Sequence, residues 1–293
     1  MAAWIRMKKF CVVTNVEKDK GYKTARQLKE LLENLGGECI LVQDRFVETC
    51  EDEFIDYRDI PKDTDCIIIL GGDGTLIQAA IDMHQFKIPF LGVNLGTLGF
   101  LTEIEVENLE RDLKKLLETE GRIEKRMLLK GKISIQGALE EELALNDFVI
   151  SKAGLCRLIT LDVYVNDEWI DTYVADGLII SSPTGSTGYN LSAGGPVLVP
   201  EVPAMIITPI CPHSLNKRSL VVSSQDKIKV VVGQSKTAAE DEAVVIPDGS
   251  CTGRLVTGDW MEICPAKDKV QLVRLKEMSL LGRLRQKLGR ELE

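Results

Sequence analysis

The sequence predicts an N-terminal α/β domain with an open, Rossmann-like parallel sheet, followed by a C-terminal all-β sandwich domain. The first observation is that short apolar runs alternate with segments of helical apolar spacing up to about residue 122. The second is that the apolar period changes to two after that point, as in strands with one buried face. A chain of 293 residues is also long enough for two domains, at roughly 100 to 200 residues each. We therefore expect domains at residues 1–122 and 123–265, with a tail at residues 266–293.

The first domain begins with the apolar run FCVVTN, which we expect to be a buried strand. The segment TARQLKELLENLGG is predicted to be a helix, because its apolar residues share one face and Gly36 and Gly37 end it. That face comprises Ala25, Leu28, Leu31, Leu32 and Leu35. The runs ECILVQ, CIIIL and IPFLGVN follow as further strands, and TEIEVENLERDLKKLLETEG contains a second helix. This order predicts a sheet with helices on both faces.

The second domain is predicted from short strands that are separated by turn residues. RLITLDVYV alternates apolar residues with others, and Asn166-Asp167 is expected to make a tight hairpin turn into EWIDTYV. Further strands are expected at LIISS, AMIITPI, SLVVSS, KIKVVV, AVVIPDG and KVQLVRL. The tail carries leucines at helical spacing beside basic residues, which favours docking on the protein's own core over a membrane surface. These leucines are Leu280, Leu281, Leu284 and Leu288.

Charge and composition exclude several classes of protein. With 36 Lys and Arg against 45 Asp and Glu, the net charge of -9 gives no general attraction to nucleic acid or anionic membranes. The eight cysteines include no C-x-x-C pair and are accompanied by two histidines, which disfavours a zinc site and a disulfide framework. The apolar run near the first residue is too short for a secretory signal and lacks a small-residue cleavage pattern, so we expect no such signal. No apolar run reaches the roughly 18 residues of a membrane span. We therefore expect a cytoplasmic protein with no nucleic-acid or membrane partner.

The stretch CIIILGGDGT places Asp73 among glycines directly after an apolar strand. Ligands bind at the carboxyl ends of strands in open α/β sheets, and glycines there let backbone N–H groups approach phosphate. The stretch is not a P-loop, because the chain contains no G-x-x-x-x-G-K-[ST]. It is not the G-x-G-x-x-G fingerprint either, because Ile77 stands where the third glycine belongs. Asp73 is therefore expected to accept a proton from a hydroxyl, to hold a divalent cation that bridges phosphates, or to make a structural Asx turn.

Three other segments carry groups that suit a nucleotide. ADGLIISSPTGSTGYNLSAGGPVL offers several hydroxyls, amides next to glycines and one aromatic ring, Tyr189, that can lie against a base. A plain turn is the alternative for its Pro-Thr-Gly part. In ALNDFVI, the side chains of Asn146 and Asp147 match a ribose diol. GVNLGTLGF adds Asn94, Gly96, Gly99 and Phe100, either as ligand contacts or as part of a tight strand-to-helix bend.

Four segments resemble, in the same order, the signatures of the ATP-NAD kinases of bacterial type. They are GGDGT, LND, DGLIISSPTGSTGYNLSAGGP and PICPHSLNKRSLVV. The resemblance runs from about Met7 to the end of the sequence. GGDGT is shared with lipid and sugar kinases, whereas the TGSTGYN segment is far more specific to NAD kinases.

This resemblance implies transfer of the γ-phosphoryl group of ATP to the 2′-hydroxyl of the adenosine ribose of NAD, which gives NADP and ADP. It also implies a divalent metal ion, such as Mg2+, on the donor oxygens, and a homodimer or homotetramer. Asp73 matches the family's proton acceptor, Phe100 an aromatic near the adenine, and Asn146 with Asp147 the pair that binds the ribose. The other implied ligand contacts are Gly74, Arg157, Asp176, Thr184, Thr187, Gly188, Tyr189, Asn190, Leu191 and Ser192. In this family the tail, here residues 266–293, is a helix that returns to the first domain.

The sequence departs from the family pattern at three places. Gln78 stands where many members have a basic residue, Val174 replaces a frequent polar or basic residue, and Ser279-Leu280 replaces a usual Ser-Phe. Two alternatives remain open. A lipid kinase shares GGDGT but needs an apolar acceptor pocket where this chain has SSPTGSTGYN, and a non-catalytic NAD(P)-binding regulator has no need of Asp73. The sequence also leaves open whether polyphosphate replaces ATP and whether NADH is accepted.

Overall fold

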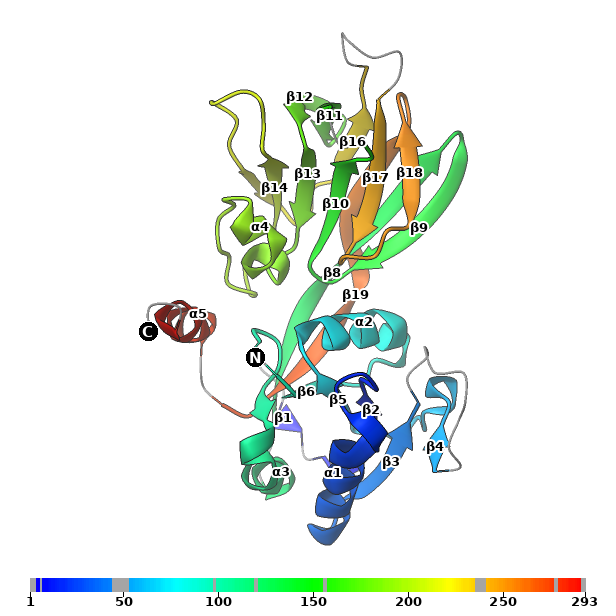
Figure 1. The fold of residues 1–293 in the computed structure, drawn as a ribbon, viewed down its shortest axis with the longest axis vertical. Helices are drawn as coiled ribbons and strands as arrows, with labels where there is room; N and C mark the ends of the chain where they lie inside the picture. The colour runs from blue at the N-terminus through cyan, green and yellow to red at the C-terminus, as the bar shows by residue number, and fades with distance from the viewer. Residues whose placement is uncertain are drawn as a thin grey trace. The chain divides into compact units, whose positions relative to one another are not determined.

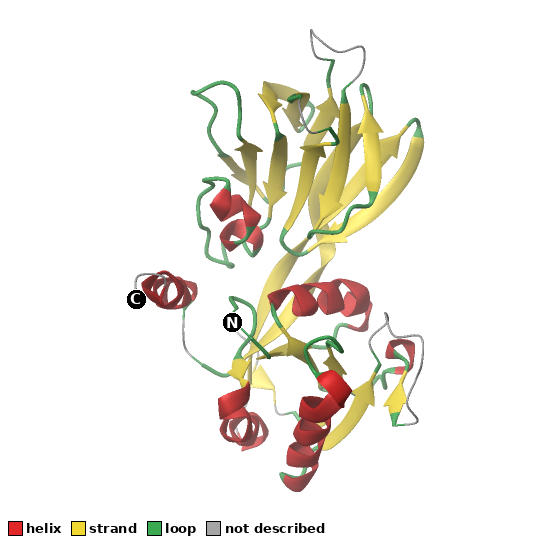
Figure 2. Ribbon diagram, viewed as in Figure 1, coloured by secondary structure: helices red, strands yellow, loops and turns green. Residues whose placement is uncertain are grey.

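The structure is a computed structural model that describes residues 4–5, 7–43, 53–96, 99–118, 121–154, 157–234, 241–276 and 279–290. The chain divides into two compact units (Figure 1). Unit 1 comprises Met1–Lys125 and Val270–Glu293, and unit 2 comprises Arg126–Lys269. Figure 2 shows helices and strands together in unit 1 and mostly strands in unit 2. The predicted combination of an α/β domain with an all-β domain is therefore confirmed.

Unit 1 is built on a parallel sheet in the order β19-β6-β5-β2-β3-β4. Its strands are β2 (Lys9–Thr14), β3 (Glu38–Val42), β4 (Phe54–Ile55), β5 (Cys66–Gly71), β6 (Phe90–Asn94) and the end of β19 (Trp260–Arg274). β5 is buried at every position, which explains why CIIIL is apolar at successive residues. Two short strands complete the unit: β7 (Ile104–Glu105) pairs with β6, and β1 (Trp4–Ile5) pairs with the start of β8 (Gly121–Ile135).

Helices cover both faces of this sheet, as predicted. α1 (Lys23–Asn34) and α3 (Leu109–Glu118) share one buried core with alternate residues of β2, β5 and β6. α2 (Asp73–Met83) packs on β5 and β6 from the opposite face, where a Cβ added to Gly92 would lie 2.6 Å from Cδ1 of Leu76. The helix α5 (Leu280–Arg290) also belongs to this unit. Short 3-10 helices are η1 (Lys20–Tyr22), η2 (Tyr57–Asp59), η3 (His84–Phe86) and η4 (Val106–Asn108).

Unit 2 is a sandwich of two antiparallel sheets around one apolar core. One sheet has the order β15-β14-β13-β10-β17-β18, and the other contains β12-β11-β16-β19 together with β8 and β9. The strands not yet given are β9 (Ala138–Ala144), β10 (Asp147–Lys152), β11 (Ile159–Val165), β12 (Glu168–Ala175), β13 (Gly177–Ser181), β14 (Ala204–Ile210), β15 (Leu220–Ser223), β16 (Ile228–Val232), β17 (Glu242–Pro247) and β18 (Gly253–Val256). Phe148 and Ile180 from the first sheet pack with Leu161 and Met261 from the second. η5 (Gly185–Thr187) and α4 (Tyr189–Ser192) follow β13.

Of two tight hairpins in unit 2, the sequence analysis predicted the one between β11 and β12 but not the one between β8 and β9. Asn166 and Asp167 have φ values of 51 and 67 degrees between β11 and β12, so the predicted turn is confirmed. The hairpin between β8 and β9 was not predicted, although it turns at Gln136 and Gly137 with φ values of 49 and 86 degrees. β9 reads ALEEELA and is exposed at its first four positions, so it carries no apolar alternation.

The tail contains the helix α5, and the structure describes the side chains of three of its four leucines. Leu281 is 59% exposed, while Leu280 and Leu284 are only partly buried. The side chain of Leu288 lies outside the described residues. Among the described side chains of α5, Arg283 is buried and pairs with Glu103, so ion pairs contribute to the contact of this helix with the rest of unit 1 beside the partly buried leucines. In the described parts of the chain, no helix combines the length and apolar character needed to cross a membrane.

Candidate functional site

Asp73 lies at the turn between a central strand and the helix that follows it. β5 ends at Gly71, Gly72 is extended, and Asp73 is the first residue of α2. The carboxylate is therefore at the carboxyl edge of the parallel sheet and at the N-terminal, positively polarised end of a helix. This is the position in which a residue of an open α/β sheet meets an anionic ligand.

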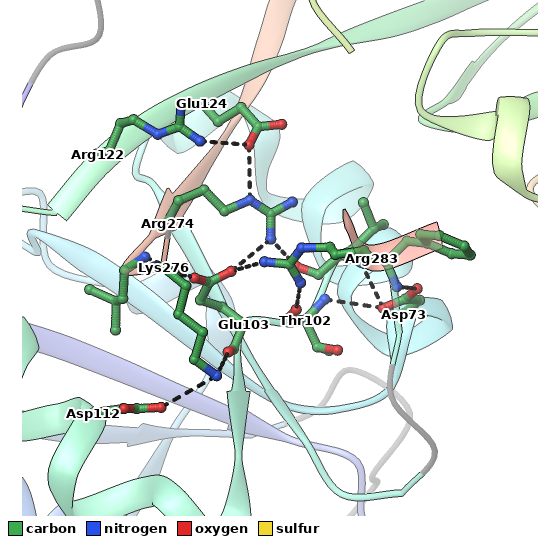
Figure 3. Close-up of polar contacts among 12 residues, drawn as sticks. Asp73, Thr102, Glu103, Asp112, Arg122, Glu124, Arg274, Lys276 and Arg283 are labelled. Carbon is green, nitrogen blue, oxygen red and sulfur yellow. Dashed lines mark hydrogen bonds and ion pairs between the residues drawn. The ribbon is translucent and has the colours of Figure 1, made fainter. Parts of the chain in front are cut away.

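The carboxylate of Asp73 is held by the backbone of a distant segment (Figure 3). Oδ2 accepts the N–H of Phe100 at 2.6 Å, and Oδ1 accepts those of Leu101 and Thr102, both at 3.1 Å. An Asx turn would bond an N–H two residues further along α2, so the Asx-turn alternative is wrong. Two lone pairs of Oδ1 are used and only one of Oδ2, which leaves Oδ2 able to accept one more proton donor.

Two glycines near this carboxylate have opposite surroundings. A Cβ added to Gly99 would lie less than 3.0 Å from both carboxylate oxygens of Asp73, so residue 99 must be glycine for the carboxylate to keep its place. A Cβ added to Gly74 would meet no atom within 4 Å. Gly74 is therefore not required by packing within the described structure, and the space beside it is open to a ligand.

A cavity of about 230 Å³ lies beside the glycine turn in unit 1. Its lining residues are Val13, Asn15, Gln43, Tyr57, Gly74, Thr75, Gln78, Ala79, Asp82 and Met83. Gln78 donates its amide to Asp82 at 3.1 Å, so it faces a carboxylate of its own helix. A positive charge reaches the turn from elsewhere, because a Cβ added to Gly72 would lie 3.2 Å from Nζ of Lys18.

Unit 2 brings the predicted ribose pair together with the predicted aromatic ring. Asn146, Asp147 and Tyr189 line one cavity of about 300 Å³. Its other lining residues are Val149, Ile246, Asp248 and Gly249. Asp147 begins β10 and is 5% exposed, whereas Tyr189 is 48% exposed. A buried acid and an open ring suit a ligand with both hydroxyls and a flat apolar face.

Asp248 shapes this cavity, and the sequence interpretation missed it. Its carboxylate accepts the N–H groups of Leu145 at 2.6 Å, Asn146 at 2.8 Å and Asp147 at 3.0 Å. Burial and the charge of Asp248 raise the pKa of Asp147 to about 7. Burial also raises the pKa of Asp248, although the three N–H donors act against that rise. The one signal in the sequence was the Pro-Asp-Gly turn after AVVI, where Asp248 has a φ of 45 degrees.

The glycine-rich loop after β13 is tied to the same backbone. The N–H of Ser182 donates to the carbonyl oxygen of Asn146 at 2.8 Å. The hydroxyl of Ser182 donates to the carbonyl oxygen of Leu145 at 2.6 Å. A Cβ added to Gly185 would lie less than 3.0 Å from the carbonyl oxygen of Asn146. The loop therefore closes on Asn146 only because residue 185 is glycine.

The other predicted contacts differ in how their side chains are used. The side chain of Asn190 is fully buried and bonds the carbonyls of Ser186 at 3.1 Å and Pro196 at 3.0 Å, so it holds the loop from inside. Thr184 is buried and accepts from Arg126 at 3.3 Å. Asp176 forms an ion pair with Lys152. Residues that stay at least partly exposed are Arg157, Thr187, Gly188, Leu191 and Ser192.

The structure thus groups the predicted site residues in two sets. Asp73, Gly74 and Phe100 lie in unit 1, where Asp73 bonds Phe100 directly. Asn146, Asp147 and Tyr189 lie in unit 2 around one cavity. Arg157 and Asp176 do not line that cavity.

Comparisons with known proteins cover most of the chain. The profile of the ATP-NAD kinase N-terminal domain matches residues 10–121, and that of the ATP-NAD kinase C-terminal domain matches residues 145–275. The NAD kinase of Lachnoclostridium phytofermentans is 44% identical over 97% of this chain and 99% of its own length. The NAD kinase of Lachnospira eligens is 38% identical over 96% of this chain and 100% of its own length.

Two solved structures have a similar fold. An NAD kinase from Archaeoglobus fulgidus in complex with ATP matches with a TM-score of 0.68 and 26% identity, over 96% of this chain and 98% of that one. A yeast NADH kinase complexed with NADH matches with a TM-score of 0.83 and 21% identity, over 98% of this chain and 89% of that one. The second likeness concerns the fold alone.

Proposed function

The chain belongs to the ATP-NAD kinase family, and we infer that it transfers the γ-phosphoryl group of ATP to the 2′-hydroxyl of the adenosine ribose of NAD, giving NADP and ADP. It is thus a phosphotransferase with an alcohol group as acceptor. The structural observation that carries the chemistry is the carboxylate of Asp73, which three backbone N–H groups hold beside the open space at Gly74.

The acceptor side of the reaction is assigned to unit 2. Asn146 and Asp147 bind the ribose hydroxyls of the adenosine, and Tyr189 lies against the adenine. The shared cavity, the buried carboxylate and the half-exposed ring support this assignment. The buried Asn190 acts indirectly by holding the loop that carries Tyr189.

Asp73 is assigned the role of proton acceptor for the 2′-hydroxyl. Its Oδ2 atom has a lone pair left for one donor, and the three N–H groups hold the carboxylate in one orientation. Phosphoryl transfer leaves little covalent work to the protein, so alignment of the hydroxyl with the γ-phosphorus carries most of the catalysis. General-base help adds about 10² to 10⁴-fold in rate.

The donor phosphates are assigned to the glycine turn and the N-terminus of α2. Support comes from the open space at Gly74, from the helix end and from the ammonium of Lys18 beside Gly72. Lys18 then supplies the positive charge that Gln78 lacks. The relative from Archaeoglobus fulgidus, 26% identical, was solved in complex with ATP. Inorganic polyphosphate offers the same chemistry and is a second donor to test.

A divalent metal ion, for which Mg2+ is the first choice, is proposed to arrive on the donor. Among the described residues no group of three or more His, Cys, Asp or Glu side chains could hold a metal. Mg2+ is usually bound by substrate phosphates, water and at most one or two carboxylates. The phosphates of ATP and water would therefore supply most of the ligands of the ion. When bound, the ion neutralises charge on the β- and γ-phosphate oxygens.

Self-association into a homodimer or homotetramer is proposed from an apolar edge of unit 2. β12 ends its sheet and exposes Trp169 by 56%, Ile170 by 37% and Val174 by 43%. An exposed apolar edge strand needs cover, and a second copy of the chain would supply it. Trp169→Glu should therefore lower the sedimentation coefficient, whereas Leu139→Glu, a change at an equally exposed leucine, should not.

A cytoplasmic location is proposed from the thiols. The six described cysteines are all free, and Cys50 and Cys156 lie outside the described residues. Free thiols persist in a reducing compartment.

The test of this function is a coupled assay on the pure protein. NAD, ATP and Mg2+ should yield NADP, measured with an NADP-specific dehydrogenase, and the 2′-deoxyadenosine analogue of NAD should yield no product. ATP consumption at the same rate with the deoxy analogue would place the reaction elsewhere. Binding of NAD without any NADP would favour a non-catalytic regulator.

A further inference from the structure

Glu103 is a buried acid whose described side-chain partners all come from the C-terminal part of unit 1 (Figure 3). Its side chain is 0% exposed and pairs with Arg274 at 3.2 Å and with Arg283 of α5. It also accepts the N–H groups of Leu275 at 2.9 Å and Lys276 at 2.7 Å. A buried carboxylate must be paired to be tolerated, so this cluster fixes α5 to residue 103.

The same two arginines also bind the segment that holds Asp73. Arg274 donates to the carbonyl of Leu101 at 2.8 Å, and Arg283 donates to the carbonyl of Thr102 at 2.7 Å. The carbonyl of Leu101 and the N–H of Thr102 belong to one peptide group. That group is therefore held by Arg274 at its oxygen while its N–H bonds Oδ1 of Asp73. Hydrogen bonds in such a chain polarise and orient one another.

A second contact from α5 reaches the other end of this segment. Nζ of Lys287 lies 4.3 Å from the ring centroid of Phe100, whose N–H bonds Oδ2 of Asp73. Arg283 and Lys287 are four residues apart, so they lie on one face of the helix. That face contacts both ends of the segment from Phe100 to Thr102.

We propose that Arg283 is a positioning residue of the reaction, which orients the carboxylate of Asp73 through the backbone of Phe100 to Thr102. The proposal rests on the function assigned to Asp73 above. Arg283 touches neither NAD nor ATP in this scheme. It sets the direction of the free lone pair of Oδ2, and a misplaced reacting group costs up to about 10²-fold in rate.

The primary variant is Arg283→Lys, which keeps the charge opposite Glu103 but loses the fork that bonds Thr102 and Glu103 together. The matched control is Arg285→Lys, the same change at an exposed position of the same helix. We expect kcat of Arg283→Lys to fall by about 10 to 100-fold with KM for NAD within about twofold. Arg285→Lys should keep both constants.

A double-mutant cycle separates positioning from a general structural role. If Arg283 acts through Asp73, Arg283→Lys should lower kcat far less in an Asp73→Asn background than in the native one. The proposal would be overturned if the fold-loss of kcat in the double variant equalled the product of the fold-losses in Arg283→Lys and Asp73→Asn. A kcat of Arg283→Lys equal to that of the Arg285→Lys control would also overturn it.

Hydrogen exchange gives a readout that needs no activity. The amides of Phe100, Leu101 and Thr102 bond Asp73, so their exchange should be faster in Arg283→Lys than in Arg285→Lys. Unchanged exchange would overturn the proposal even if activity fell. If the native protein made no NADP, the function would fail, while faster exchange would still show that Arg283 holds this segment.

Discussion

Gly99 lies so close to Asp73 that a side chain at residue 99 would occupy the space of the carboxylate. The two residues are 26 positions apart, yet each limits what the other can be. Gly99→Ala should therefore displace the carboxylate and lower kcat by about 10²-fold or more, because proton acceptance and alignment are lost together. Initial rates with saturating NAD and ATP measure this. A kcat near the native value would mean that the orientation of Asp73 does not matter for turnover.

Gly74→Ala is the matched change on the other side of the same carboxylate. A Cβ at residue 74 meets no atom within 4 Å, so the melting temperature should stay within about 2 °C of the native value. Activity should nevertheless fall if ligand fills that space, and the loss should appear as a higher KM for ATP. A kcat and a KM for ATP equal to the native values in Gly74→Ala would show that the phosphates of ATP do not bind beside this turn.

Asp73→Asn should abolish most of the turnover and also lower stability slightly. Asn offers one acceptor oxygen and an NH2 group, so at least one of the three N–H groups from Phe100 to Thr102 loses its acceptor. An unsatisfied buried N–H costs about 1 to 3 kcal/mol, which calorimetry of unfolding can resolve. We expect kcat to fall by at least about 10²-fold while NAD affinity changes little. Retained activity would refute the catalytic role.

The raised pKa of Asp147 predicts a pH-dependent stability. Its pKa is about 7 in the folded protein against an ordinary 3.8, so between these values the unfolded chain releases a proton that the folded chain keeps. Rising pH therefore favours unfolding, by about 1.4 kcal/mol for each unit of separation. The free energy of unfolding of the native protein relative to Asp147→Asn should decrease from pH 4 towards pH 7 and level off above it. Urea titrations across this range measure the difference, and a flat difference would contradict the raised pKa.

Lys18→Ala should weaken the binding of ATP, the phosphoryl donor, and should not change the binding of NAD, the acceptor. The ammonium of Lys18 lies beside Gly72, where donor phosphates are proposed to bind. Losing one charged contact costs about 1.5 to 3 kcal/mol, so KM for ATP should rise by about tenfold or more. Lys20→Ala, at an exposed residue of the same segment, serves as the control. An unchanged KM for ATP in Lys18→Ala would show that Lys18 does not contact the phosphates of ATP.

Much of the fold could be predicted because its signals are local. β5 is an unbroken apolar run, and Asn166-Asp167 suits the φ values of its turn. The turn that carries Asp73 could be found for the same reason. The partners of Asp73 could not, since a carboxylate that bonds N–H groups 27 to 29 residues away leaves no pattern in its neighbourhood.

Asp248 and Arg283 were missed for related reasons. Asp248 binds residues that precede it by 101 to 103 positions, so its local Pro-Asp-Gly context indicates only a turn. In α5, the helical spacing of the leucines predicted an apolar docking face, whereas Arg283 is buried through ion pairs. Spacing reports which residues share a face and says nothing about which face finds a partner.

The hydrogen bonds of Asp248 also make the cavity proposed for the dinucleotide depend on the closure of a long loop as the chain folds. They join Leu145, Asn146 and Asp147 to a residue more than 100 positions later, and closing so long a loop is slow compared with forming the adjacent β11–β12 hairpin. Collapse and much of the secondary structure can precede this closure. If NAD binds this cavity as proposed, it binds only chains in which the loop has closed, and it therefore favours them over chains in which the loop is open.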